Sequence, residues 1–162
     1  MKLVELRGHN KPSLWAIVDD EDYDRVIEAG PWRRRVQSNT TYSQRSVFID
    51  GRHTTQMLHN FITDWNMVDH IDHDGLNNQR SNLRRATRSQ NNHNQRPRYG
   101  GTSQYKGVSL YKQRGKWFAL LRIDGRLIYL GLFDDEVEAA LAYDRHARIE
   151  FGEFAYLNFP DL

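Results

Sequence analysis

The chain has 162 residues, of which 38% are hydrophobic, and this size suits one or two small globular units rather than a large enzyme fold. It contains no cysteine, which excludes disulfides and thiolate zinc sites, and no apolar run is long enough for a membrane span or a signal-peptide core. The net charge is only +2, but residues 65–103 hold six basic residues against three acidic ones, which favours a polyanionic partner.

The first third of the chain is predicted to be a support region built from short elements. An acidic turn at 19–22 precedes a helix, and the Asp50-Gly51 pair marks a turn between strands. Three consecutive arginines, Arg33 to Arg35, are more typical of a solvated strand edge than of a binding motif. The predicted strands cover 1–9, 12–18, 32–36 and 41–49, and the predicted helices cover 23–29 and 56–62.

The central segment, 68–94, combines acidic, imidazole and amide side chains with several arginines. Asp69 and Asp72 offer hard oxygen ligands, while His70 and His73 can exchange a proton near neutral pH. Such a set is typical of metal-assisted phosphodiester hydrolysis. The pattern predicts a strand over 67–71, a polar loop, a second strand or turn near 81–85, and a helix that ends at Asn94.

The order of Asp69-His70, Asn82-Leu83-Arg84 and Asn91 resembles the HNH endonucleases, in particular their phage and intron homing branch, over about 55–95. The resemblance implies a ββα-metal unit in which His70 is the general base and Asn82 orients the loop. It also implies that Asp69 and Asn91 hold one divalent metal ion, Mg²⁺ or Mn²⁺. A phage source, and hence the cytoplasm of a bacterial host, would follow from the resemblance alone.

Several side chains near this motif have plainer interpretations. His73 is expected to hydrogen-bond within the loop, and His59 to be structural. His93 competes with Asn91 as the third site residue, but two positions along a helix turn a side chain by about 200°, so both cannot face one ion. The arginines of the segment are either a solvated face or contacts to a phosphate backbone; they are Arg80, Arg84, Arg85 and Arg88.

Residues 96–103 have the polar, glycine and proline content of a linker, after which a second small domain is predicted. Strands are expected near 105–108, over 115–124 and over 126–133, with a helix over 135–151 that Gly152 ends. Alternation places Trp117, Ala119, Leu121 and Ile123 on the face that the helix covers. The opposite face carries Lys116, Phe118, Leu120 and Arg122. Val137, Ala140, Leu141 and Tyr143 are the expected apolar positions of the helix.

The motifs YKGV, GKWFALLR, YLGLF and LNFP resemble, in order and spacing, the plant ethylene-response-factor (Apetala-two) type of DNA-binding domain over 104–160. That resemblance implies a sheet that lies in the major groove and reads bases. Ser109, Leu120 and Tyr129 depart from the plant pattern, whereas Arg122 keeps it. The DNA contacts implied by the resemblance, or by charge and face, are Lys106, Lys112, Arg114, Lys116, Arg122, Arg126 and Tyr129.

The sequence thus predicts an α+β protein with three parts. Residues 1–95 form an HNH nuclease unit, with support strands over 1–55 and the ββα-metal motif over about 56–95. Residues 96–103 form a linker, and residues 104–162 form a three-stranded antiparallel sheet packed on one helix. Its function is predicted to be metal-dependent cleavage of double-stranded DNA by a monomer or homodimer without membrane contact. The alternative is a DNA-binding regulator or inhibitor with a silent HNH unit; an RNA-directed nuclease and a purely supportive C-terminal domain rank lower.

Overall fold

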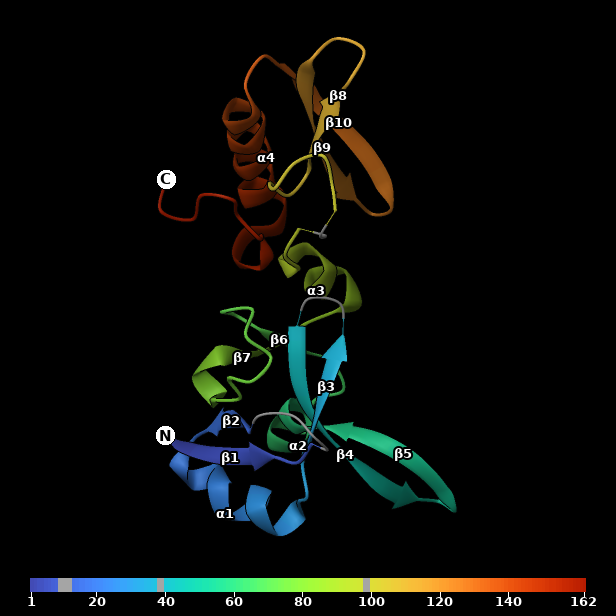
Figure 1. Ribbon diagram of the computed structural model, residues 1–162, viewed down its shortest axis with the longest axis vertical. Coiled ribbons are helices and arrows are strands. Elements are labelled where there is room, and N and C mark those ends of the chain that lie inside the picture. The colour runs from blue at the N-terminus through green and yellow to red at the C-terminus, as the bar shows by residue number, and fades with distance from the viewer. Residues whose placement is uncertain (9–12, 38–39, 98–99) are drawn as a thin grey trace. The chain divides into compact units, whose positions relative to one another are not determined.

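The computed structural model describes residues 1–8, 13–37, 40–97 and 100–162, and it divides into two compact units, 1–87 and 88–162 (Figure 1). Both units combine helices with antiparallel strands, so the predicted α+β class is confirmed. The division falls after Thr87, ahead of the stretch over 96–103 for which a linker was predicted. Residues 98 and 99 of that stretch lie outside the described residues, and the linker stays a prediction.

The described residues of the first unit form three antiparallel sheets and two helices. A two-stranded ribbon leads into the first helix, a three-stranded meander follows, and a short hairpin ends the unit. In chain order its elements are β1 (Lys2–Leu6), β2 (Leu14–Val18), α1 (Asp20–Ala29), β3 (Arg33–Gln37), β4 (Thr40–Ile49), β5 (Arg52–Met57), α2 (Leu58–Thr63), β6 (Val68–His70), the 3₁₀ turn η1 (Arg80–Asn82) and β7 (Leu83–Arg85).

The core of the first unit joins the ribbon, α1 and α2. Trp32 is fully buried there and donates a hydrogen bond from its indole nitrogen to the Val26 carbonyl at 2.8 Å. Apolar burial is the main source of stability for so small a core, and tying the one polar atom of the indole removes its desolvation cost. The Arg33–Arg35 run lies on β3, an edge strand of the meander, as expected for a solvated edge.

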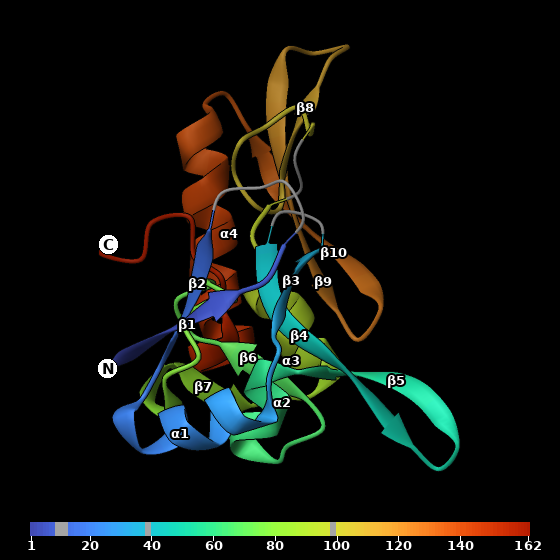
Figure 2. The same ribbon diagram turned by 60° about the horizontal axis from the view of Figure 1, so that its bottom comes forward.

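The second unit is a three-stranded sheet with one long helix along one face (Figures 1 and 2). The strands follow the order β10-β9-β8, and the hairpin between β9 and β10 turns at Asp124-Gly125 as predicted. The elements are α3 (Arg88–Asn94), β8 (Val108–Tyr111), β9 (Lys116–Ile123), β10 (Arg126–Phe133), α4 (Glu136–Phe151) and the 3₁₀ turn η2 (Gly152–Phe154).

The predicted faces of β9 are confirmed, but two helix positions are not. Ala119 and Leu121 are buried in a core that Trp117 and Ile123 extend. On α4 the buried stripe is Ala139, Ala140, Tyr143 and Ala147, whereas Val137 is 41% exposed and Leu141 is only partly buried. Val137 lies in the first turn of α4, before the buried stripe begins at Ala139. Small alanines at the contact let α4 approach the strands closely.

The predicted ββα-metal unit is not formed within one unit of the protein. Its two strands, β6 and β7, pair in the first unit, whereas its helix, α3, belongs to the second. In the second unit α3 is tied to residues that the sequence places far along the chain, among them Lys106 and Tyr156. These contacts hold α3 within the second unit.

Candidate nucleic-acid interface

Asp69 and Arg84 form an ion pair between β6 and β7. They lie opposite each other in the hairpin, and Nη2 and Nε of Arg84 lie 2.7 Å and 2.9 Å from Oδ2 of Asp69. The two side chains are only 7% and 13% exposed, so the pair is well shielded from water. Charge-assisted bonds of this kind stabilise a short hairpin that has few ladder bonds of its own. The predicted roles of Asp69 as a metal ligand and of Arg84 as a DNA contact stay predictions.

Asn82 holds the loop that follows His70. Its Oδ1 accepts the Asp72 N–H at 3.0 Å, and its Nδ2 donates to Asp72 Oδ1 and to the Asn77 carbonyl, each at 2.8 Å. Burial alone would raise the pKa of Asp72, but donors from Asp74, Asn77 and Asn82 hold that pKa below its ordinary value. Asn82 therefore organises the polar loop from its centre.

His70 lies in a buried cluster with His59 and Tyr42. The His70 and His59 ring centroids are 5.0 Å apart, and the Tyr42 ring lies 5.8 Å and 5.9 Å from them. Burial lowers the pKa of His70, against the opposing effects of Asn78 and the nearby carboxylates. Burial, followed by the charge of His70, lowers the pKa of His59 to about 3. His59 is thus neutral at pH 7, which fits the structural role expected for it.

Acid is expected to destabilise the first unit through His59. The unfolded chain binds a proton at this imidazole near pH 6.5, whereas the folded state does not until about pH 3. Because the unfolded state then binds more protons, the free energy of unfolding falls by about 1.4 kcal/mol per pH unit below pH 6.5. Urea titrations at pH 7.5 and pH 5 measure the loss. His59→Phe keeps the ring contacts and should flatten the dependence; an unchanged slope would contradict the assignment.

The four arginines predicted to contact DNA differ in what surrounds them. Arg80 donates hydrogen bonds to Asp22 through Nε and Nη2, each at 2.8 Å. These hydrogen bonds are the main reason why the pKa of Arg80 is raised. Arg84 is paired with Asp69, as described above. Arg85, at the end of β7, and Arg88, at the start of α3, have exposed side chains. These two are better placed than Arg80 and Arg84 to meet a phosphate without giving up a carboxylate.

His73 and Asn91 are the remaining residues considered for the predicted site. His73 adopts a left-handed backbone with φ of 63°, and its N–H donates to the His70 carbonyl at 3.1 Å. Asn91 belongs to the second unit. Within the described ranges, no group of three or more histidine, cysteine, aspartate or glutamate side chains could hold an ion. The Mg²⁺ or Mn²⁺ ion stays a prediction.

The second unit presents one sheet face away from α4. Residues opposite each other in antiparallel strands share a face, and the register pairs Arg122 with Leu127 and Leu120 with Tyr129. It also pairs Phe118 with Ser109 and Lys116 with Tyr111. We call this set the outward face: Ser109, Tyr111, Lys116, Phe118, Leu120, Arg122, Leu127 and Tyr129. Alternation on β9 alone could not show which residues of β8 and β10 join it.

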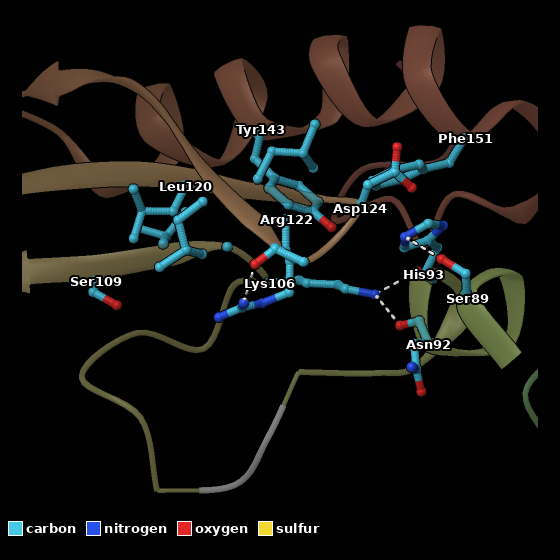
Figure 3. Close-up of a pocket in the computed structure, with 15 residues that line it drawn as sticks. Ser89, Asn92, His93, Lys106, Ser109, Leu120, Arg122, Asp124, Tyr143 and Phe151 are labelled. Atoms are coloured by element: carbon cyan, nitrogen blue, oxygen red, sulfur yellow. Dashed lines mark hydrogen bonds between the residues drawn. The ribbon is translucent and has the colours of Figure 1, made fainter.

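The basic side chains around the outward face are held loosely. The Arg122 guanidinium donates to the Gly125 carbonyl at 2.9 Å (Figure 3), and Lys116 pairs with the exposed Asp134 at 2.9 Å. Exposed contacts of this strength are readily exchanged for phosphate or base contacts. Lys112 and Arg114 lie exposed in the β8–β9 turn, and Tyr129 is 60% exposed. Arg126 pairs with Ile123 and so begins β10 on the α4 side of the sheet.

Lys106 differs from the other predicted contacts because its ammonium group points into the protein. Nζ donates to the main-chain carbonyls of Asn92, His93 and Gln95, the three oxygens around the end of α3 (Figure 3). Burial lowers the pKa of Lys106 to about 8. No pattern in the sequence indicates this arrangement, because the lysine and the helix end come together only in the folded unit.

In the described part of the chain, none of the helices has the length and apolar character that crossing a membrane requires.

No family model matches the chain. About 36% of the chain is 49% identical over 61 residues to "APETALA2-like protein 2" of Oryza sativa subsp. japonica. A similar share is 49% identical over 61 residues to "Dehydration-responsive element-binding protein 2D" and 43% identical over 58 residues to "AP2-like ethylene-responsive transcription factor TOE2", both of Arabidopsis thaliana. The matched parts make up 14%, 28% and 12% of these three relatives.

These relatives overturn the prediction of an HNH endonuclease, which is wrong. All three are plant proteins; one is named for binding a responsive element and one as a transcription factor, and none is named for DNA cleavage. The predicted phage source is therefore wrong as well. The residues of the motif also suit a stable polar hairpin, in which Asp69 pairs with Arg84 and Asn82 organises the loop. Their presence in this order therefore does not by itself indicate a nuclease. What the comparisons show is that about a third of this chain is similar to part of these Apetala-two and responsive-element-binding proteins.

Proposed function

We propose that this chain is a DNA-binding regulator that places the outward face of its β8-β9-β10 sheet in the major groove of duplex DNA. The proposal rests on two observations together. The sheet has a solvent-facing face with basic side chains, and the sequence is similar to that of a responsive-element-binding protein. A two-stranded or three-stranded ribbon fits the major groove, where side chains reach the base edges. The helix α4 covers the opposite face and supports the sheet from behind.

The side chains of the outward face divide into two roles. Arg122 lies on the face near the β9–β10 turn and is suited to a base contact, because a guanidinium can bond two acceptors of guanine at once. Lys116, Lys112 and Arg114 lie around the β8–β9 turn and are suited to phosphates. Tyr129 adds an exposed ring beside Leu120. Arg85 and Arg88, which are exposed, are auxiliary phosphate contacts, whereas Arg80 and Arg84 are committed to carboxylates.

Selection from a random duplex library, followed by fluorescence anisotropy over a range of salt concentrations, tests this function. Wild type should bind the selected duplex more tightly than a scrambled one of the same composition. Arg122→Ala should weaken binding to the selected duplex by about 10-fold to 100-fold and reduce the preference for it. Lys116→Ala should weaken binding to both duplexes and reduce the salt slope by about one.

The matched control is Arg148→Ala, which removes the same type of charge from the exposed surface of α4, on the other side of the sheet. It should leave both affinities within about twofold, since it changes only the long-range field. Equal losses from Arg122→Ala and Arg148→Ala would show that binding depends on total charge and not on the outward face. Wild type that never prefers one duplex over another would overturn the proposed function.

A further inference from the structure

A cavity of about 460 Å³ lies beside α3, lined by outward-face residues of the sheet and also by Tyr143 and Phe151 of α4 (Figure 3). Ser109, Leu120 and Arg122 line it from the sheet, while Ser89 and Asn92 line it from the helix. A ligand that lies on the outward face near Arg122 is therefore within reach of the α3 side chains. Side chains of α3 and of the outward face therefore line one continuous cavity.

Three contacts hold α3 in this position. Lys106 donates to the carbonyls of Asn92, His93 and Gln95, at the end of the helix where its dipole is negative. The His93 ring stacks on Phe151 at the end of α4, with centroids 3.6 Å apart and an interplanar angle of 11°. The Tyr156 N–H donates to the His93 carbonyl at 3.2 Å. An isolated seven-residue helix is not stable in water, so these contacts determine where it lies.

We infer that α3 is a second DNA-contacting element of the same unit, in which Ser89 and Asn92 bind the nucleotides next to those covered by the sheet. Lys106 is then a positioning residue and not a phosphate contact, because its ammonium protons are already directed at carbonyl oxygens. This inference rests on the proposed function, since it needs duplex DNA on the outward face. It extends that function to a partner surface longer than the sheet.

The chemistry of the cavity indicates which part of DNA the helix meets. Asp124 also lines the cavity, and its negative charge disfavours a phosphate at that point. A hydroxyl and a carboxamide can instead donate to and accept from base edges or sugar oxygens. The α3 contacts are therefore hydrogen bonds that release few counterions, in contrast to the contact of Lys116.

A double-mutant cycle on the full chain tests the inference, with the selected duplex as the probe. The three variants are Ser89→Ala/Asn92→Ala, Lys106→Met and their combination. The first should bind about threefold to tenfold more weakly with an unchanged salt slope, because it loses neutral hydrogen bonds. Lys106→Met should cause a similar loss, and the combination should be no weaker than Lys106→Met alone. Lys116→Ala is the control for a charge contact, with a slope reduced by about one.

Two results would overturn the inference while leaving the proposed function intact. Unchanged affinity of Ser89→Ala/Asn92→Ala, whose two positions are exposed and outside the core, would show that α3 does not touch DNA. A slope reduced by about one in Lys106→Met, with losses that add, would show that Lys106 meets a phosphate directly. Circular dichroism of Lys106→Met checks that the sheet remains folded, and a wild type without duplex preference would remove both proposals together.

Discussion

Replacing Gly107 by alanine is expected to lower the free energy of unfolding of the second unit by about 4 kcal/mol. A Cβ at this position would lie 2.0 Å from Cδ2 of Tyr143 and 2.8 Å from the Leu120 carbonyl oxygen, both far inside contact distance. The backbone also has φ of 76°, where a side chain adds its own strain. Tyr143 is buried against the sheet and cannot move aside without opening the core.

Two comparisons separate the steric clash from the backbone effect. Gly115→Ala also places a side chain at positive φ, 62°, but nothing lies within 4 Å of its Cβ, so it should cost only about 1 kcal/mol. Tyr143→Leu should reduce the cost of Gly107→Ala by removing the ring that it meets. Urea titration with hydrogen-exchange mass spectrometry over residues 105–159 reports on this unit in the full chain. Equal losses for Gly107→Ala and Gly115→Ala would contradict the clash.

Asp144→Ala is the second substitution with a large expected effect, a loss of about 3 kcal/mol in the same measurement. The buried carboxylate accepts the Asn158 N–H at 2.9 Å, the Asn158 Nδ2 at 3.0 Å and the Phe159 N–H at 2.8 Å. Asn158 in turn accepts the Lys106 N–H at 2.7 Å. Alanine would leave several donors without acceptors, and the chain end would lose its attachment to α4 and β8.

The control for this substitution is Glu150→Ala, which removes a carboxylate from an exposed position of the same helix and should change stability by less than about 0.5 kcal/mol. Asp144→Asn keeps one acceptor oxygen and should fall between the two. A loss in Asp144→Ala no larger than that in Glu150→Ala would show that the network does not anchor the chain end. Because Asn158 also holds Lys106, Asp144→Ala is expected to loosen α3 as well.

Local patterns in the sequence determined much of the second unit. Alternation along β9 separates Ala119 and Leu121 from Lys116 and Arg122, because a strand has a period of two and one side must be buried. The Asp124-Gly125 turn defines the hairpin, since both residues adopt positive φ. The LNFP motif contains Asn158, whose side chain donates a hydrogen bond to Asp144 on α4. The alternation and the turn act between residues that are neighbours in the chain or in one sheet, whereas the Asn158–Asp144 contact joins residues 14 positions apart.

In the central segment, local sequence patterns led to a wrong prediction of a nuclease site. Asp69, His70 and Asn82 have the residue types and the order of a catalytic motif, but residue type does not show what a side chain contacts. The structure pairs Asp69 with Arg84 across a hairpin and surrounds His70 with His59 and Tyr42. The order of these residues along the chain is compatible with a metal site and with a stable polar hairpin.

The sequence by itself determined the α+β class, the strands β9 and β10 and the two faces of β9, because hydrophobic periodicity and turn residues act locally. The first strand was predicted near 105–108, but β8 begins at Val108, because residues 105–107 form a turn. Only the tertiary structure decided which unit α3 joins and what Lys106 does. Both depend on contacts between residues that are distant in the chain, such as the stacking of His93 on Phe151 and the capping of a helix by Lys106. Such contacts form when the folded core brings the groups together, and no local pattern specifies them.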